Sequence, residues 1–433
     1  MAAESDTVRF ALSARAARTG PQPISFLMRQ AVENPSLISL AAGLVDYESL
    51  PVQPSRRGFE RVLDDGRGRH TLQYGTTIGD ATLRQRLLEH LANLDGIAPA
   101  AFDATADDMV IANGSQQLLF LLTEVLVDPG DIVITAAPSY FVYTGTLQTF
   151  GAQVRCVDMD EHGMVPAALE AVLERLEAQG ELGRVKIVYV CDYFQNPTGL
   201  TLAVERRAEL LRIVQRYSTG HRILLIEDAA YRELSYGDDP PPSIKSHDKS
   251  NACVALLQTF SKPFAPGLKI GYGLLPRDLV EPVVLQKGNH DFGSANLCQQ
   301  LALAAMESGD YQRHVEALCR RYRAKRDAML EALERELGDF EPGNTQWTRP
   351  GGGLYVYLTL PERFDAGPHG ALFDRAIGEG VLYVPGTYCF GPDPDRVAPS
   401  NTMRLSFGVC SIEQIREGIA RLARAIRAID TGQ

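Results

Sequence analysis

The feature that most constrains the fold of this 433-residue chain is an alternation of short apolar runs with helical patterns between about residues 105 and 275. Continuous β-branched runs are typical of strands buried on both faces, and the amphipathic segments between them suit crossover helices. The expected strands are Ile132–Thr135, Gln153–Val157, Val185–Cys191, Ile223–Glu227, Val254–Phe260 and Ile270–Leu275, and the expected helices are Ser115–Val127, Tyr140–Phe150, Pro166–Ala178 and Val204–Tyr217. The pattern predicts an α/β fold with a mostly parallel central sheet sandwiched by helices, in which ligands bind beyond the carboxyl ends of the strands.

After Leu275 the pattern changes to one that is typical of a second, smaller domain. Helical periodicity continues to roughly Leu337, notably in Tyr311–Leu333. The glycine run Gly351–Gly353 then leads into an expected strand Leu354–Leu360, a helix Ala371–Glu379, strands Val381–Val384 and Met403–Phe407, and a final helix Ile412–Ile429. The expected organisation is a large domain over 46–325, a small α+β C-terminal domain over 326–433, and an N-terminal arm, 1–45, that forms part of the small domain.

Charge and composition exclude several classes of protein. With 43 basic and 54 acidic residues the formal net charge is −11, which argues against a nucleic-acid-binding face. No apolar run approaches the length of a membrane span, and Met1–Gly20 has no apolar core of a secretory signal. The seven cysteines are isolated and the eight histidines lack metal-ligand spacing, so we expect a cytoplasmic protein without a metal.

Two polar strings each follow an apolar run and could be a simple turn or a ligand site. Asn113-Gly114-Ser115-Gln116 opens a helix, where unpaired N–H groups, a glycine and a hydroxyl suit an anion, although plain capping is the commoner explanation. Asn196-Pro197-Thr198-Gly199 is typical of a turn, and its functional interpretation directs the Asn196 amide at a ligand oxygen.

The expected strand Ile223–Glu227 leads into Asp228, so that a buried strand ends in two carboxylates, and Tyr231 follows three residues later. A charge that leaves a buried strand is costly unless it has a partner. A cationic ring nitrogen would be such a partner, and helix capping by Asp228 is an equally good explanation of this string alone.

Two further strings place cations next to apolar strands. Thr259-Phe260-Ser261-Lys262 is followed seven positions later by Lys269, and hydroxyls with a second cation beside a lysine suit a phosphorylated aldehyde held as an imine. Met403-Arg404-Leu405 places an arginine within an apolar strand, where it needs a carboxylate from the protein or from a substrate. A lysine on a strand-end turn is usually just solvated.

Taken together, the strings NGSQQ, FQNPTG, EDAAY, TFSKPFAPGLKIGY and MRLSFG occur in order from residue 113 to 408. The ordered set resembles the fold-type I, pyridoxal 5′-phosphate (PLP)-dependent class I/II aminotransferase family. The form FQNPTG is most similar to the 2-aminoadipate and kynurenine aminotransferase II group. Weaker matches at Gly43, at Leu72–Gly75 and at residues 351–358 extend the resemblance over nearly the whole chain.

The resemblance implies a role for each matching residue around the cofactor. Lys262 would hold PLP as a Schiff base and carry the proton between the substrate's α-carbon and the cofactor, and Asp228 would pair with the pyridine nitrogen. Asn196 and Tyr231 would hydrogen-bond the ring's O3′ oxygen, and Tyr140 would stack on the ring face. The phosphate would be held by Gly114, Ser115, Gln116, Ser261 and Lys269, with Thr259 as a further candidate.

The resemblance also implies contacts to the substrate and to a second subunit. Arg404 would bind the substrate's α-carboxylate, with Gly43, Asn196 and Tyr355 as further substrate contacts. Tyr74 would reach the phosphate from the neighbouring subunit of a homodimer. In one respect the chain departs from the family, which usually has arginine where this chain has Lys269. The charge is kept and the bidentate fork is lost.

The implied reaction is transfer of an amino group from an L-amino acid to a 2-oxo acid by a ping-pong mechanism, in amino acid metabolism or biosynthesis. The same residues would also serve a PLP-dependent lyase, cyclase or synthase. A transcription factor that carries an aminotransferase domain is a third alternative, and the acidic charge argues against it. One sequence leaves the donor amino acid open.

Overall fold

The computed structural model describes residues 10–34, 36–64, 66, 68–237 and 239–431. Its largest element is an eight-stranded sheet in the order β2-β9-β8-β7-β6-β3-β4-β5. In that order the strands are Met109–Asn113, Ile270–Leu274, Val254–Thr259, Leu224–Asp228, Val185–Cys191, Ile132–Ala137, Gln153–Asp160 and Gly163–Met164. The strands from β8 to β4 are parallel, whereas β9 runs antiparallel to both of its neighbours and β5 antiparallel to β4.

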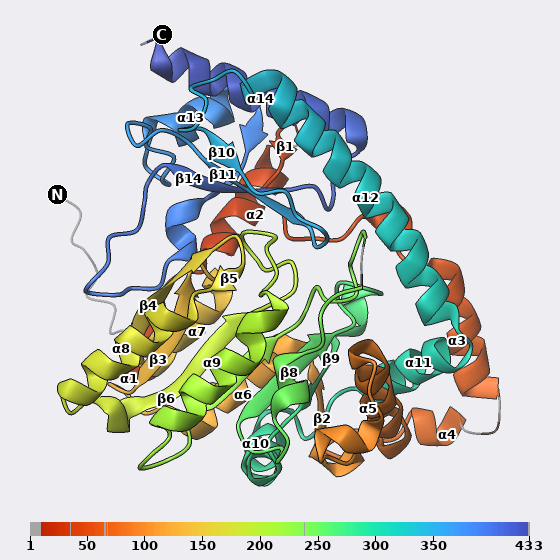
Figure 1. Ribbon diagram of the computed structural model, residues 1–433. Coiled ribbons are helices and arrows are strands. Elements are labelled where there is room, and N and C mark those ends of the chain that lie inside the picture. Colours follow the sequence, from red (N-terminus) through yellow and green to blue (C-terminus); the bar gives the residue numbers. More distant parts are fainter. Residues whose placement is uncertain (1–9, 35, 65, 67, 238, 432–433) are drawn as a thin grey trace, which may run out of the picture.

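Helices cover both faces of this sheet, as the apolar pattern predicts (Figure 1). On one face lie α5 (Ala81–Asp95), α8 (Pro166–Ala178) and α9 (Val204–Tyr217), and on the other lie α6 (Ser115–Leu126), α7 (Phe141–Phe150) and α10 (Arg277–Asp291). Alternate residues of each strand enter the two cores: Leu225 packs with α8 and α9, whereas Ile226 packs with α6 and α7. This alternation decides which side chains can meet at the end of each strand.

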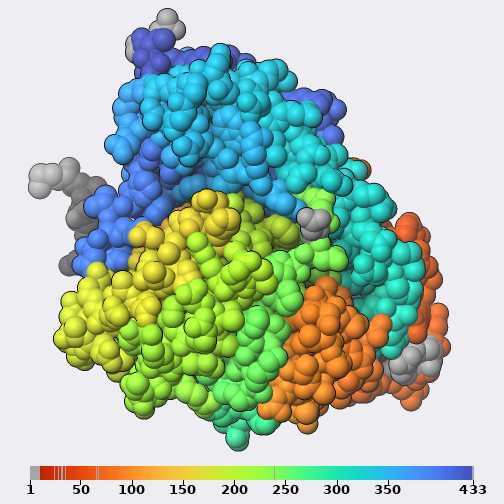
Figure 2. Space-filling view, in the orientation of Figure 1, coloured from red at the N-terminus to blue at the C-terminus, as the bar shows by residue number. Residues whose placement is uncertain are grey.

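A smaller α+β unit lies above the carboxyl ends of these strands (Figure 1). Its antiparallel sheet has the order β10-β11-β14-β13, formed by Gln346–Trp347, Tyr355–Thr359, Thr402–Ser406 and Val384–Pro385. The helices α13 (Ala371–Gly378) and α14 (Ile412–Asp430) pack on each other beside it. In Figure 2 this blue unit meets the yellow and green segments of the large sheet along a single boundary.

The N-terminal residues and one long helix connect the two parts. The strand β1 (Ile38–Ser39) pairs in parallel with β12 (Val381–Leu382), which places this segment against the smaller unit, whereas residues 14–19 contact α6 and α7 of the large unit. The helix α12 (Asp310–Leu337) runs without a break from the large sheet's side to α14, on which it packs. The remaining helices are α1 (Ala14–Arg18), α2 (Pro23–Glu33), α3 (Val52–Asp64), α4 (Gly68–Thr71) and α11 (Asn296–Glu307).

The fold class and most of the expected elements are confirmed, and α8, α9 and β6 have the expected bounds. One expectation is wrong: the segment Val381–Val384 is two short strands in different sheets. Val381 and Leu382 pair with β1, while Val384 pairs with Arg404 of β14. A continuous apolar run cannot reveal this switch, because the residues in both strands are equally buried. Within the described residues no helix combines the length and apolar character needed to cross a bilayer.

Candidate active site

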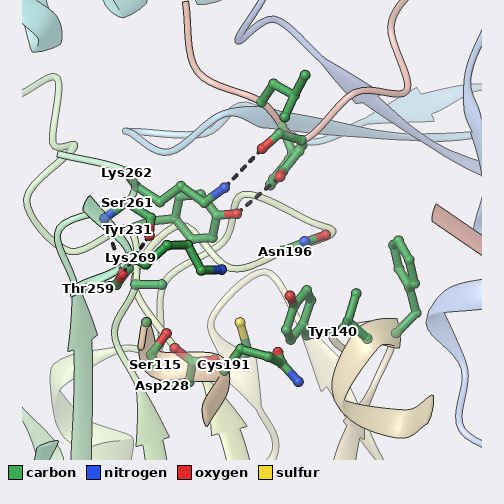
Figure 3. Close-up of a pocket in the computed structure, with 18 of the residues that line it drawn as sticks. Ser115, Tyr140, Cys191, Asn196, Asp228, Tyr231, Thr259, Ser261, Lys262 and Lys269 are labelled. Atoms are coloured by element: carbon green, nitrogen blue, oxygen red, sulfur yellow. Dashed lines mark hydrogen bonds between the residues drawn. The ribbon is translucent and has the colours of Figure 1, made fainter. Parts of the chain in front are cut away.

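A cavity of about 330 Å³ lies at the carboxyl ends of the large sheet's strands and below the smaller unit (Figure 3). Strand ends contribute Asn113, Cys191, Asp228 and Thr259 to its wall. The remaining lining residues are Gly43, Leu44, Gly114, Ser115, Gln116, Tyr140, Phe141, Val142, Asn196, Ala230, Tyr231, Ser261, Lys262, Lys269, Tyr355 and Arg404. The parallel topology brings the strand-end residues together, and the smaller unit and the segment after β1 add Arg404 and Gly43, which are 361 residues apart in the sequence.

One group of lining residues presents N–H groups, hydroxyls and a cation. Gly114, with a φ of 76°, turns the chain from β2 into α6, and Ser115 begins the helix. The Thr259 and Ser261 hydroxyls lie 2.9 Å apart, and Lys269 follows a short turn from them. In Figure 3 Thr259, Ser261, Lys262 and Lys269 are grouped on one side of the cavity. A helix N-terminus beside hydroxyls and a lysine suits a phosphate dianion.

A glycine of the neighbouring strand permits this arrangement. Gly271 lies in β9 between Ala112 of β2 and Thr259 of β8. A Cβ atom at Gly271 would lie 2.2 Å from the Ser115 nitrogen and 2.3 Å from the Gly114 carbonyl carbon. Only glycine therefore lets the start of α6 approach the sheet this closely.

The carboxylate of Asp228 is buried at the end of β7. Its Oδ2 accepts a hydrogen bond of 2.9 Å from the Tyr189 hydroxyl, and its Oδ1 has no hydrogen-bond partner among the described residues. Burial raises the pKa of Asp228 to about 6, and the hydrogen bond from Tyr189 opposes that rise. A buried acceptor without a partner at a cavity wall fits a ligand that brings its own donor.

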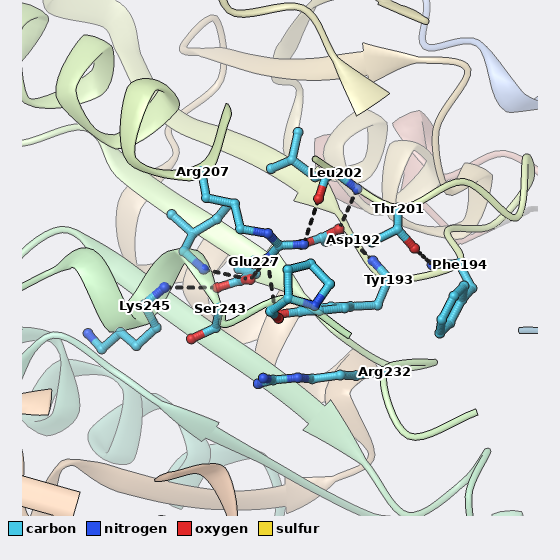
Figure 4. A network of polar contacts seen from close by, with 12 residues as sticks. Asp192, Tyr193, Phe194, Thr201, Leu202, Arg207, Glu227, Arg232, Ser243 and Lys245 are labelled. Atoms are coloured by element: carbon cyan, nitrogen blue, oxygen red, sulfur yellow. Dashed lines mark hydrogen bonds and ion pairs between the residues drawn. The ribbon is translucent and has the colours of Figure 1, made fainter. Parts of the chain in front are cut away.

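Glu227, the other carboxylate in this string, points to the opposite face of the sheet and takes no part in the cavity. It accepts hydrogen bonds from the Ile244 and Lys245 backbone amides and from Arg207 of α9 (Figure 4). The same guanidinium is 2.7 Å from Asp192, and all three side chains are fully buried. Burial raises the pKa of Glu227 to about 7, and Arg207 opposes the rise. Strand alternation thus assigns one carboxylate to the cavity and the other to an internal ion network.

The amine of Lys262 lies in the cavity and donates to the Gly43 carbonyl oxygen at 2.9 Å. It is 5.6 Å from the centre of the Tyr231 ring. The hydroxyls of Tyr231 and Tyr355 are 3.0 Å apart, and a Cβ atom at Gly43 would lie 2.9 Å from the Tyr355 hydroxyl. Burial raises the pKa of Tyr231 well above its usual value, so this phenol stays protonated and can donate.

Arg404 is buried in β14 and its side chain is held from three directions. Its two terminal nitrogens donate to the Asn196 amide oxygen at 2.8 Å and to the Ala41 carbonyl at 2.7 Å. The guanidinium lies 4.3 Å from the centre of the Tyr355 ring, and its Nε has no hydrogen-bond partner among the described residues. No carboxylate of the described residues pairs with Arg404. The side chain is fixed in place and has a free donor for a carboxylate.

All but one of the residues predicted from the sequence line this cavity. The exception is Tyr74, which lies outside it and is 81% exposed. The sequence also missed several lining residues: Leu44, Asn113, Phe141, Val142, Cys191 and Ala230. Most are apolar, and an apolar side chain next to a motif gives no signal that separates a cavity wall from the core.

The donor set fits PLP. The Gly114–Ser115 turn, the two hydroxyls and Lys269 fit its phosphate, the free Oδ1 of Asp228 fits its ring nitrogen, and the Lys262 amine fits its aldehyde. No group of three or more His, Cys, Asp or Glu side chains in the described ranges is arranged to hold a metal ion.

Comparison with known proteins agrees with this geometry. Residues 35–422 match the model of the family described as aminotransferase class I and II. The aromatic-amino-acid aminotransferase 1 of Thermococcus litoralis is 35% identical over 396 residues, which cover 92% of this chain and 89% of the relative. These matches favour transamination over the lyase, cyclase or synthase alternative.

Two solved structures are similar over nearly the whole chain. The kynurenine aminotransferase of Pyrococcus horikoshii superposes with a TM-score of 0.86 at 33% identity, covering 96% of this chain and 97% of that one. The α-aminoadipate aminotransferase of Thermus thermophilus, complexed with N-(5′-phosphopyridoxyl)-L-leucine, superposes with a TM-score of 0.81 at 30% identity, covering 98% of each chain. The chain therefore belongs to the class I and II aminotransferase family and is a PLP-dependent transaminase of fold type I.

Proposed function

We propose that the cavity transfers the amino group of an L-amino acid with an uncharged side chain to a 2-oxo acid. The observation that carries the proposal is the convergence of Lys262, the unpartnered Asp228 oxygen and Arg404 on one cavity. An amine, a buried carboxylate and a fixed guanidinium are the groups needed to hold a cofactor aldehyde, its ring nitrogen and a substrate carboxylate.

Bound PLP supplies an electron sink that makes the α-C–H bond of the amino acid acidic. Lys262 would accept the α-proton as its general base and return it on the cofactor's side, because its amine lies within the cavity. Asp228 would keep the ring nitrogen protonated, and Tyr231 and Asn196 would hydrogen-bond the ring's O3′ oxygen. Tyr140 would cover one face of the ring, and Gly114, Ser115, Gln116, Ser261 and Lys269 would hold the phosphate, together with Thr259.

The charges of the cavity support an uncharged donor side chain. Among the described lining residues the cations are Lys262, Lys269 and Arg404. If these bind the aldehyde, the phosphate and the α-carboxylate, none of the cations that line the cavity in the described part of the chain is left for a second carboxylate. Leu44, Phe141 and Val142 offer apolar surface beside Gly43 and Tyr355. We therefore favour aromatic or aliphatic donors over 2-aminoadipate, and the name of the Thermococcus litoralis relative supports the aromatic ones.

We further propose a homodimer in which Tyr74 reaches the partner's phosphate site. Tyr74 and Phe292 are 81% and 64% exposed and form an edge-to-face pair with ring centres 5.8 Å apart. Other exposed apolar side chains are concentrated nearby in sequence, at Tyr47, Val52, Phe59, Leu63 and Leu72. Large apolar side chains exposed in such numbers support an interface between subunits.

The division into 1–45, 46–325 and 326–433 also stays a proposal. The pairing of β1 with β12 supports joining the end of the N-terminal arm to the smaller unit, whereas α1 contacts α7 of the large unit, and residues 1–9 lie outside the described part of the chain. The unbroken helix α12 crosses residue 325, so that boundary would fall inside a helix. We place the enzyme in the cytoplasm, in amino acid metabolism or biosynthesis, and its seven unpaired cysteines support a reducing compartment.

The test is the absorption spectrum of the purified holoenzyme, recorded while single L-amino acids are added. An aromatic or aliphatic donor should bleach the band of the lysine-bound cofactor, and a 2-oxo acid should restore it. The rate with 2-aminoadipate should be clearly lower. Equal or faster bleaching by 2-aminoadipate would overturn the proposed donor class, and release of ammonia without an acceptor would overturn transamination.

A further inference from the structure

Tyr189 is a fully buried residue of β6 that does not line the cavity and yet contacts one of its principal groups. Strand alternation directs its side chain to the same face of the sheet as Asp228 of the neighbouring strand β7. The Tyr189 hydroxyl donates to Oδ2 of Asp228 at 2.9 Å, while Oδ1 has no hydrogen-bond partner in the described part of the chain.

Burial of Tyr189 raises the pKa of its phenol well above the usual value, and the nearby Asp228 adds to the rise. The phenol therefore stays protonated and acts only as a donor toward the carboxylate. By donating to one oxygen it fixes the rotation of the carboxylate, so that the second oxygen is the one left free.

We propose that Tyr189 is a positioning residue, which holds Asp228 as an oriented carboxylate so that Oδ1 meets the ring nitrogen of PLP. The inference rests on the proposed pairing of Asp228 with that nitrogen. It assigns to β6 a role in cofactor binding that none of the cavity-lining residues reveals.

A second tyrosine provides a matched control. The rings of Tyr143 and Tyr189 are in contact, with centres 4.4 Å apart, and both side chains are fully buried. The Thr123 hydroxyl donates to the Leu119 carbonyl oxygen, so the Tyr143 hydroxyl, 3.1 Å from Thr123, is the donor in that pair. Tyr143 thus donates its hydrogen bond to Thr123 and not to Asp228. Loss of its hydroxyl removes one buried hydrogen bond from the same packing environment.

The titratable groups near Asp228 come from several elements. These groups are the phenols of Tyr140, Tyr143 and Tyr189, the thiol of Cys191 and the amine of Lys262. Burial raises the pKa values of the phenols and of the thiol, which keeps them neutral near pH 7. The Lys262 amine stabilises the ionised carboxylate. Of the phenols, only that of Tyr189 donates a hydrogen bond to the carboxylate.

The experiment compares Tyr189→Phe with Tyr143→Phe by two readouts, the dissociation constant of PLP and the pH profile of the half-transamination rate. Loss of the Tyr189 donor should weaken PLP binding about tenfold, as expected for a hydrogen bond to a charged group. It should also raise the pKa of Asp228, so the acid limb of the profile moves about one pH unit upward. Tyr143→Phe should leave both quantities at the wild-type value.

Asp228→Asn separates the inference from the proposed function. If this variant binds PLP as tightly as the wild type, the proposed pairing of Asp228 with the ring nitrogen is wrong. If Asp228→Asn weakens binding and Tyr189→Phe behaves like Tyr143→Phe, the pairing stands and the role of Tyr189 is overturned. In the Asp228→Asn background, Tyr189→Phe should no longer move the acid limb.

Should Tyr189→Phe not fold, the wild-type holoenzyme offers a second measurement. With isotope-labelled tyrosine, the infrared C–O band of a phenol that donates to a carboxylate should shift when Asp228 is replaced by Asn. The Tyr143→Phe protein should show the same shift. Absence of a shift in both proteins would contradict the positioning role.

Discussion

At the scale of single residues, the site contains charged groups whose burial would cost folding free energy elsewhere in the protein. Among the residues that the structure describes, Asp228 is buried with one oxygen unpartnered, and Arg404 is buried without a carboxylate partner. Neither arrangement stabilises the fold by itself, because buried charge costs free energy unless it is compensated. The compensation that fits both is a ligand with a cationic ring nitrogen and a carboxylate.

The cost at Asp228 predicts how the stability of the apoenzyme depends on pH. A carboxyl whose pKa rises from 3.8 to about 6 on folding binds a proton that the unfolded chain has already released, so stability falls as pH rises between these values. Above pH 6 the cost levels off at about 3 kcal/mol. Apo Asp228→Asn should therefore be more stable than the wild type to urea at pH 7.5. The gain should shrink as the pH falls from 6 toward 4.

Glu227 also has a raised pKa, but it is present in the wild type and in Asp228→Asn alike. It therefore contributes equally to the pH dependence of stability in the two proteins. The same Asp228→Asn substitution should weaken PLP binding, so that stability and function change in opposite directions. A variant that is less stable than the wild type at pH 7.5 would contradict the assignment of an uncompensated charge.

Arg404 leads to a prediction about substrate affinity. In Arg404→Lys the charge remains and the planar fork is lost, so KM for L-amino acids should rise about tenfold or more. The PLP dissociation constant should change little, since the proposed phosphate contacts come from other segments. Steady-state kinetics with a good donor would check this. An unchanged KM would show that the α-carboxylate binds elsewhere.

How far these residues could be predicted depended on where they lie in the sequence. Lys262 and Asn196 follow apolar strands and Asp228 ends one, and at these places a polar side chain stands out against its neighbours. Tyr189 lies inside such a run, in Val185–Cys191, where an aromatic residue is ordinary core material. Its contact with Asp228 depends on the register between β6 and β7, which a single sequence does not contain.

At the scale of secondary-structure elements, parallel strands with crossover helices explain why the site lies where it does. Because each β–α turn falls at the same edge of the sheet, motifs far apart in sequence converge there. The sequence predicted the alternation of elements well, since long apolar periodicity is a strong signal. It did not predict that β9 is antiparallel, because an apolar run has no direction.

The close approach of β9 to α6 can be tested with two glycines. Gly271→Ala places a methyl group 2.2 Å from the Ser115 nitrogen, so the phosphate turn or the strand must shift. We expect a loss of about 1–3 kcal/mol in unfolding free energy, as is typical of overpacking, together with weaker PLP binding. Gly267→Ala is the control, because a Cβ atom there meets nothing within 4 Å. If both variants melt and bind PLP alike, the close approach has no consequence for the site.

At the scale of the whole molecule, a single chain exposes several large apolar side chains, Tyr74 and Phe292 among them. Tyr74 matches the family's motif and yet lies outside the cavity of its own chain. Both observations are explained by a second copy, which would cover Tyr74 and Phe292 and receive the Tyr74 hydroxyl at its phosphate site. The sequence could predict this only through the resemblance, because an exposed aromatic residue in one chain does not identify its partner.

Mixing the Lys262→Ala and Tyr74→Ala variants, each of which we expect to have lost most of its activity, decides whether Tyr74 acts across the interface. In a mixed dimer of Lys262→Ala and Tyr74→Ala subunits, one site would lack both groups, and the other would combine the intact Lys262 of one subunit with the intact Tyr74 of its partner. Random reassociation makes about half of the dimers mixed, so up to about a quarter of wild-type activity should return. If Tyr74 instead serves its own chain, each site of the mixed dimer keeps one defect and no activity returns. Sedimentation of the unmixed variants checks that each still assembles, since activity can return only where dimers exchange subunits.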